Sequence, residues 1–358
     1  MLDRALTQRI ANAVARGGGA RGAGPPKPVT LPGDLAAICA DAERRVVAYT
    51  GLRPAAPLPA PESVPRSDWI AANVNSMAAL LDPLGERLSG GAAGGLAFLR
   101  GPARAAMATL ISTEAGVLTG YLSQRVLGQY EFVLVDPASP TRLLFVAPNI
   151  ARAATRLEAD AEQLLTWIAF HEVTHAVQFA GVPWLRPHLA GLLNELLDSL
   201  DVKVDPRVLL RLPSVDDMRE AVSGLRENGL VGVLGGAGRR DLLERVQSVM
   251  GVVEGHAEHV MDVVGAQALP DLDALRAALD RRRHERPPLI ALLERLIGLD
   301  AKLRQYEDGK RFCDAIAAAA GPAVLHTVFD GPEQLPSPAE LQDPDAWIRR
   351  TAAGSAAA

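Results

Sequence analysis

Residues 167–179 read WIAFHEVTHAVQF, and the rest of the chain is best understood from this stretch. His171 and His175 are four residues apart, so on an α-helix they share one face and can bind one metal ion through imidazole nitrogens. Glu172 lies about a hundred degrees around the helix from His171. There its carboxylate can take a proton from a water molecule that the metal activates. The spacing is typical of a zinc-hydrolase helix.

The residues around the two histidines are almost all apolar, which indicates that the helix is buried. They are Trp167, Ile168, Phe170, Val173, Val177 and Phe179. Two imidazoles and a carboxylate in such a setting need partners, because burying an unpaired polar group is unfavourable, and a metal ion supplies them. There are two simpler alternatives to a metal site: the motif arises by chance, or the two histidines are ordinary core residues. The long helical segment and a suitable acidic ligand further along the chain favour a metal site.

A catalytic zinc ion needs a third protein ligand and keeps one position open for water. The candidates lie in VEGHAEHVMD, residues 253–262. On one helix Glu254, Glu258 and Asp262 share a face, whereas His256 and His259 point elsewhere. The spacing therefore favours an acidic ligand supported by an acidic second-shell partner over a histidine ligand.

The segment EGHA, residues 254–257, resembles the Glu-Gly-Phe-Ala element of gluzincin peptidases, in which the glutamate binds the metal. By that resemblance Glu254 completes the site and Glu258 orients one of the imidazoles. A register shifted by one helical turn makes Glu258 the ligand and Asp262 the orienting residue, and both registers stay open.

Hydrolysis of an amide also needs a donor that stabilises the oxyanion of the substrate. Tyr306 is our candidate for this donor, with His256 and His259 as the next choices. The alternative for Tyr306 is a packing residue whose hydroxyl group reaches solvent.

A wider resemblance extends over most of the chain. It rests on WIAAN (69–73), FHEVTHAVQF (170–179), EGHAEHVMD (254–262), KLRQYEDGKRF (302–312), LPSPAE (335–340) and PDAW (344–347). These segments are similar to a bacterial family of zincin-like metallopeptidases. Its members are named as proposed hydrolases or as proteins associated with biosynthesis of a deazaflavin coenzyme. The resemblance implies a mostly helical, zincin-like fold.

The composition sets limits on the function. A chain of 358 residues with 48% hydrophobic residues can bury a large core. The net charge of -5 and the lack of a long basic stripe argue against a nucleic-acid partner. We expect no membrane partner either, because no stretch is long and apolar enough to cross a bilayer and no signal peptide is recognised. Cys39 and Cys313 show no metal-ligand spacing and suit a reducing cytoplasm, so we expect a cytoplasmic protein.

The predicted fold is mainly α (α+β): many helices with a small antiparallel β-sheet next to the metal-binding helix. The apolar segments at residues 132–135 and 142–146 flank DPASP and predict a hairpin just before that helix. An edge strand beside a zinc cleft can hold an extended peptide by main-chain pairing. The proline-rich residues 54–65 predict a linker or surface loop.

The positions of glycines, prolines and small residues divide the chain into three predicted segments. Glycines at 17–19 and prolines at 25–26 separate residues 1–30, which we expect to be a mobile tail. Residues 31–350 are expected to form a single helical domain with a potential division near residues 181–240. The small residues at 351–358 predict a disordered end.

The sequence thus predicts a zinc-dependent peptidase or amidase, with Zn²⁺ as cofactor, Glu172 as general base and a peptide or small amide as substrate. The alternative is a non-catalytic zincin-fold scaffold with a structural or vestigial metal site. A nucleotide- or deazaflavin-binding enzyme has little support. The glycine-rich residues 90–95 lack the Lys-Ser/Thr ending of a phosphate loop, and no strand precedes them.

Overall fold

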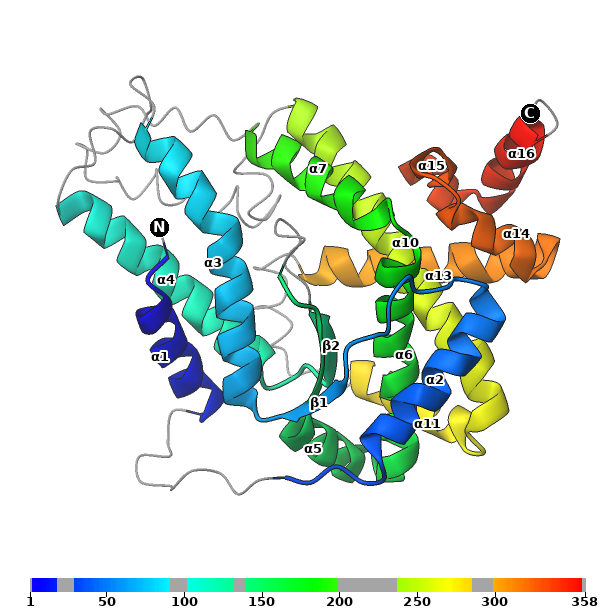
Figure 1. The fold of residues 1–358 in the computed structure, drawn as a ribbon, viewed down its shortest axis with the longest axis horizontal. Coiled ribbons are helices and arrows are strands. Elements are labelled where there is room, and N and C mark those ends of the chain that lie inside the picture. The colour runs from blue at the N-terminus through cyan, green and yellow to red at the C-terminus, as the bar shows by residue number, and fades with distance from the viewer. Residues whose placement is uncertain are drawn as a thin grey trace. The chain divides into compact units, whose positions relative to one another are not determined.

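The computed structural model describes residues 2–17, 29–90, 102–131, 139–198, 237–284 and 299–355 (Figure 1). These residues form two compact units. The first contains the described parts of residues 1–39 and 59–172, and the second those of 40–58, 173–200 and 213–358. Helices α2 (Leu35–Thr50) and α6 (Ala161–Gly181) contribute to both units. One unit boundary falls inside α6, and the single domain of residues 31–350 with a potential division near residues 181–240 stays a prediction.

A three-stranded sheet lies in the first unit. Its strands are β1 (Pro61–Val64), β2 (Gly128–Glu131) and β3 (Arg142–Val146), in the order β1-β3-β2. The central strand β3 pairs in parallel with β1 and antiparallel with β2. After Arg142 this strand is continuously apolar, and its residues 143–146 are at most 1% exposed. Such a strand is expected where both faces of a sheet are covered.

The sheet confirms the predicted strand at 142–146 and corrects the prediction in two places. Residues 54–65, predicted to be a linker or loop, contain β1, and the sheet is therefore mixed rather than antiparallel. Pro61 is compatible with this strand because it is the first residue of an edge strand. The strand predicted at 132–135 lies outside the described residues, and the described antiparallel partner of β3 is β2.

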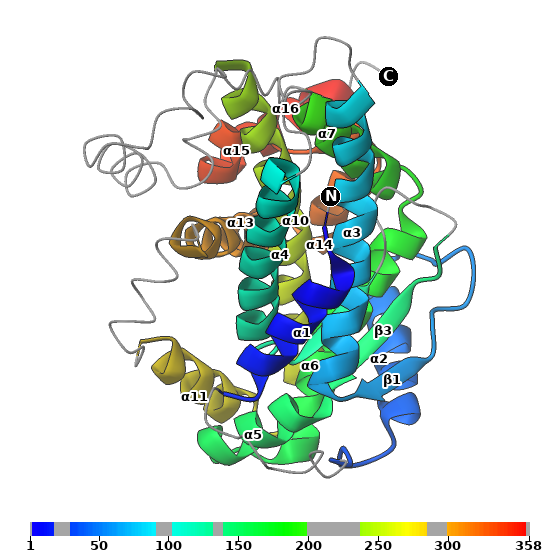
Figure 2. The ribbon, with the colours of Figure 1, turned by 90° about the vertical axis from the view of Figure 1, so that its left-hand side faces the viewer.

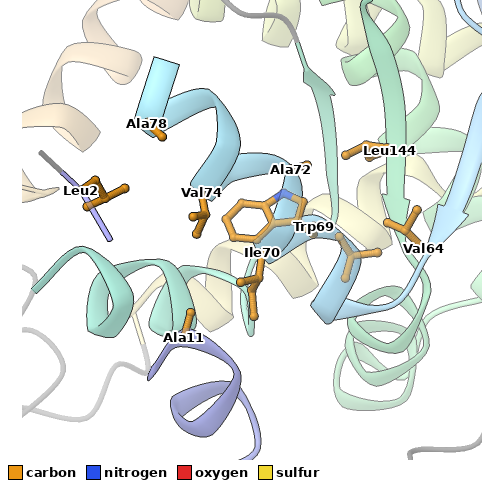
Figure 3. Packing of buried hydrophobic residues seen from close by; sticks show 10 residues of the cluster. Leu2, Ala11, Val64, Trp69, Ile70, Ala72, Val74, Ala78 and Leu144 are labelled. Atoms are coloured by element: carbon orange, nitrogen blue, oxygen red, sulfur yellow. The ribbon is translucent and has the colours of Figure 1, made fainter. Parts of the chain in front are cut away.

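Helices α1 (Arg4–Ala15), α3 (Arg66–Gly90) and α4 (Pro102–Leu122) lie side by side in the first unit (Figure 2). Another helix, α5 (Ala147–Leu157), directly follows β3. A core cluster joins Leu2, which precedes α1, to side chains of α1, α3 and the sheet, and Figure 3 shows most of its members: Leu2, Ala11, Val64, Trp69, Ile70, Ala72, Val74, Ala78 and Leu144. The apolar side chains of α3 at Trp69, Ile70 and Val74 therefore face the core of this unit.

Residues 1–30 were predicted to be a mobile tail, and this is wrong for residues 4–15, which form α1. Thr7 and Ala11 are fully buried there. The close approach is possible because α4 presents glycines: a Cβ at Gly116 would lie 2.8 Å from the carbonyl oxygen of Thr7. The glycine run that follows α1 therefore does not release this helix from the core.

The second unit is built on two crossing helices, α10 (Ala237–Ala268) and α13 (Leu299–Ala320) (Figure 1). Their backbones meet at Gly255 and Gly309, where a Cβ on either residue would overlap the other helix. The other elements are α7 (Leu185–Asp198), α11 (Leu272–His284), α14 (Pro322–His326), the 3-10 turns Thr327–Phe329 and Pro332–Gln334, α15 (Pro338–Gln342) and α16 (Pro344–Ser355).

The C-terminal end is more ordered than predicted. Residues 351–355 belong to α16, and residues 356–358 lie outside the described part of the chain. Trp347 anchors this helix: its side chain is fully buried, and its ring meets that of Phe312 edge to face at 5.7 Å. Its indole N–H donates to the carbonyl oxygen of Gln334 over 2.7 Å.

The structure confirms the predicted fold class, mainly helical with one small sheet. Among the described helices, none combines the length and apolarity needed to cross a membrane.

Candidate metal centre

Helix α6 carries both histidines of the motif. Asp160 caps its first turn, because Oδ1 accepts hydrogen bonds from the backbone N–H groups of Glu162 (3.0 Å) and Gln163 (2.8 Å). The helix then continues unbroken to Gly181. Of the apolar residues predicted around the histidines, Ile168, Phe170, Val173 and Val177 are buried, whereas Trp167 and Phe179 are partly exposed. The imidazoles of His171 and His175 therefore project from successive turns of a helix held by the core.

Three side chains of α6 and α10 come together. The ligand atoms of His171, His175 and Glu254 all lie within 4.8 Å of one another. His175 Nε2 and Glu254 Oε2 are 3.4 Å apart, and their side chains are 11% and 23% exposed. Two ligands at 2.0–2.1 Å from a tetrahedral zinc ion are separated by about 3.3 Å. The spacing and the donor set, two imidazoles and one carboxylate, therefore fit a zinc ion.

Glu172 lies on the same helix and is held by strand β2. Its side chain is largely buried, at 7% exposure. Its Oε2 accepts a hydrogen bond from the backbone N–H of Tyr130 over 3.0 Å. Gly128 leaves the space for it, because a Cβ there would lie 2.6 Å from Glu172 Cγ. The carboxylate therefore has a defined position although it has no place in the three-ligand group.

The Glu172 carboxylate also affects a thiol. Burial, with a smaller contribution from the negative charge of Glu172, raises the pKa of Cys39 from 9.0 to about 12. Burial likewise raises the pKa of Cys313. Both cysteines are free and buried. Neither thiol is therefore ionised near neutral pH, and neither competes for the metal as a thiolate.

The other acids and the tyrosine proposed from the sequence occupy different surroundings. Asp262 forms ion pairs with Lys310, at 3.0 Å, and with Arg276. Glu258 lies in α10 one turn beyond Glu254 and is not one of the three grouped side chains. Tyr306 lies in α13, and its side chain is outside the part that the structure describes.

The two histidines of α10 are not among the three grouped side chains. His259 sits between Tyr49 Oη, 2.7 Å from its Nε2, and Asp314 Oδ1, 2.7 Å from its Nδ1. His256 is fully buried and contacts the rings of His326 and Phe329. Burial, with the nearby imidazoles adding to it, holds the pKa of His256 well below its usual value, so this ring stays neutral.

Sequence reasoning did not single out Gln178, although the residue contacts His175 directly. Gln178 is fully buried in α6, three residues beyond that histidine. Its Oε1 lies 3.0 Å from His175 Nδ1. The sequence does contain a signal for this residue. Gln178 is a polar residue three positions after His175 in an otherwise apolar segment, and a buried polar side chain needs hydrogen-bond partners.

Comparison with known proteins agrees with the fold. The model of a family of zincin-like metallopeptidases matches residues 2–348. A crystal structure of a proposed hydrolase with a novel fold from Chloroflexus aurantiacus is similar, with a TM-score of 0.69 and 27% sequence identity. The similarity covers 98% of this chain and 99% of the other. None of the curated proteins compared matches the chain. The family model spans almost the whole sequence, and the chain therefore belongs to the zincin-like metallopeptidases.

Proposed function

We propose that the protein is a zinc-dependent hydrolase of the gluzincin type that cleaves a peptide or small amide bond. The observation that carries the proposal is the convergence of His171, His175 and Glu254 within 4.8 Å, with Glu172 next to the first histidine in the same helix. In this proposal the three grouped residues hold the metal ion. Glu172 is the general base.

A bound zinc ion would supply Lewis acidity, which lowers the pKa of a water molecule and polarises a carbonyl group. Glu172 takes the proton of the attacking water and passes it to the leaving amine. The hydrogen bond from the Tyr130 N–H supports this role, because it holds the carboxylate in one orientation through Oε2. Tyr306 remains our candidate donor to the substrate oxyanion, and Glu258 our candidate for orienting an imidazole.

Strand β2 supports an extended peptide as the substrate. It stands at one side of the described sheet, and β3 pairs with only one of its edges. The Val146 N–H donates to the carbonyl oxygen of Leu127, so the backbone groups of Leu127 and of every second residue after it point toward β3. By alternation, the backbone groups of Gly128 and Tyr130 point away from β3. The Tyr130 N–H that meets Glu172 lies on this outer edge, so a peptide paired there would run past the proposed base.

Two substitutions test the proposal. His175→Ala removes a ligand and should empty the metal site, as measured by metal analysis of the purified protein. Glu172→Gln keeps the volume and removes the base, so it should retain zinc and lose hydrolysis of a fluorogenic peptide library by at least about a hundredfold. Full zinc occupancy in the His175→Ala protein would refute the metal centre. A wild-type protein that binds zinc in a closed sphere of four protein ligands would support the scaffold alternative.

A further inference from the structure

We propose that Gln178 is a positioning residue that sets the tautomer and the orientation of His175 and ties α6 to the turn of α10 that carries Glu254. The inference rests on the proposed function, because it assigns His175 as a metal ligand. It assigns a role to a side chain for which the sequence analysis gave none.

The Gln178 amide forms three hydrogen bonds while fully buried. Its Oε1 lies 3.0 Å from His175 Nδ1. Its Nε2 donates to the carbonyl oxygen of Val253 over 2.9 Å and lies 3.0 Å from His256 Nδ1. The single side chain therefore links the second histidine of the motif to two residues of α10.

The carbonyl group of Val253 decides which end of the amide is the oxygen. A backbone carbonyl can only accept a hydrogen bond, so the atom of Gln178 that faces it must be the nitrogen. The flipped amide would bring two acceptor oxygens together. The oxygen of Gln178 must then face His175, and His256 Nδ1 accepts the second hydrogen of the amide nitrogen.

The orientation of the amide determines the protonation of His175. Because Oε1 of Gln178 can only accept, His175 Nδ1 must carry a proton. In the neutral imidazole the proton is then absent from Nε2. That nitrogen is the one 3.4 Å from Glu254 Oε2, so its lone pair is available to a metal ion beside the carboxylate. The opposite tautomer would place a proton where the metal must bind.

The same amide fixes the position of the third ligand. Val253 directly precedes Glu254, so the bond from Gln178 to the Val253 carbonyl oxygen holds α10 at the residue next to the carboxylate. The partner of His175 Nδ1 is the amide of Gln178 in the same helix, and not the carboxylate of Glu258 or Asp262 in α10. A neutral partner also avoids burying a further negative charge behind the ligands.

The test compares two buried amides. Gln178→Met keeps length and volume but removes all three hydrogen bonds. The matched control is Asn149→Leu in the first unit: the buried Asn149 amide donates to Ser123 O (2.8 Å) and Val126 O (2.6 Å) and accepts from Arg66 Nε (2.7 Å). Both changes leave buried groups unpaired and should lower stability. Only Gln178→Met should weaken zinc binding, by about 10–100-fold in chelator competition.

A second measurement does not depend on zinc. Nitrogen-15 NMR of histidine-labelled, metal-free wild-type protein should show His175 as the Nδ1–H tautomer, and Gln178→Met should lose that preference. Gln178→Glu keeps an acceptor for His175 Nδ1–H, so it should keep the Nδ1–H tautomer, while the lost hydrogen bond to the Val253 carbonyl oxygen should leave its zinc affinity below that of the wild type.

The failure of this inference is distinguishable from failure of the proposed function. An Nε2–H tautomer of His175 in the wild-type protein would overturn it. So would zinc affinity in Gln178→Met no weaker than in Asn149→Leu, or loss of the Nδ1–H tautomer in Gln178→Glu. Absence of zinc binding by the wild-type protein would refute the proposed metal centre, while the tautomer assignment would still be tested by NMR.

Discussion

Gly255 of α10 and Gly309 of α13 lie against each other with no room for a side chain on either residue. The contact is backbone to backbone, and Gly255 is the residue after Glu254. Packing of a glycine pair brings two helices closer than any other pair of residues allows. The position of the third proposed ligand along α10 therefore depends on a helix crossing.

Gly255→Ala should force α10 and α13 apart, because the added Cβ overlaps the Gly309 backbone. We expect a loss of about 1–3 kcal/mol in the free energy of unfolding, measured with urea, together with weaker zinc binding. Gly191→Ala in α7 is the control, because a Cβ there meets nothing within 4 Å. It should be neutral or stabilising by up to about 1 kcal/mol. Equal stability of the two variants would contradict the packing argument.

Gly128→Ala should displace the Glu172 carboxylate, because the new Cβ would lie 2.6 Å from Glu172 Cγ. A displacement of about 1 Å can lower a rate about a hundredfold, so kcat should fall by about 10–100-fold. Zinc affinity should stay within about twofold of the wild type, since Glu172 is not one of the three grouped residues. Loss of zinc in step with loss of kcat would show that Gly128 supports the ligands instead.

Trp347→Ala should destabilise the second unit by about 3–5 kcal/mol, because the side chain is fully buried against Phe312. The control is Arg349→Ala on the same helix, whose side chain is 70% exposed and lies 3.6 Å from Asp343. This exposed pair should contribute less than about 1 kcal/mol. Urea unfolding of both variants compares them, and a mild effect of Trp347→Ala would indicate that α16 does not hold this unit together.

The two thiols should resist labelling in the native protein. Burial raises the pKa of Cys39 to about 12, so the reactive thiolate is scarce at pH 8. Cys313 is fully buried as well. A disulfide reagent should therefore react slowly with the folded protein and with both cysteines once the protein is denatured. Rapid release of the chromophore from the native protein would contradict the buried placement.

His326 should make the protein less stable in acid. Burial, with a contribution from His259, lowers the pKa of His326 from 6.5 to about 4, and its ring faces Tyr49 and His256. Between pH 6.5 and pH 4 the unfolded chain binds a proton that the folded protein does not, so the free energy of unfolding falls as pH falls. The slope from this group is below about 1.4 kcal/mol per pH unit, because the ring is partly exposed.

The variant His326→Phe keeps an aromatic ring and removes the titration. Its unfolding free energy should depend less on pH between pH 4 and pH 6.5 than that of the wild type, while the dependence above pH 7 should be the same. An unchanged difference between the two proteins across this range would show that His326 titrates alike in the folded and unfolded states.

Much of the fold could be predicted because it depends on local patterns. The run after Arg142 is apolar at every position, and such a run is a buried strand whatever covers it. The helical spacing of Trp69, Ile70 and Val74 is likewise typical of a helix that packs against a core. The errors lie where distant segments decide: α1 is held by Gly116 of α4, and β1 exists because β3 is beside it. A mobile tail and a proline-rich loop were the locally reasonable predictions.

The sequence by itself determined that His171 and His175 share a face and that Glu172 is turned away from it, because the α-helix is periodic and local. Only the tertiary structure decided that Glu254, among three acids on one face of α10, meets the imidazoles, and that the partner of His175 Nδ1 is Gln178. The rotation and height of one helix against another are set by contacts such as that of Gly255 with Gly309. A contact between residues so far apart in the chain cannot be predicted from the residue spacing within either segment.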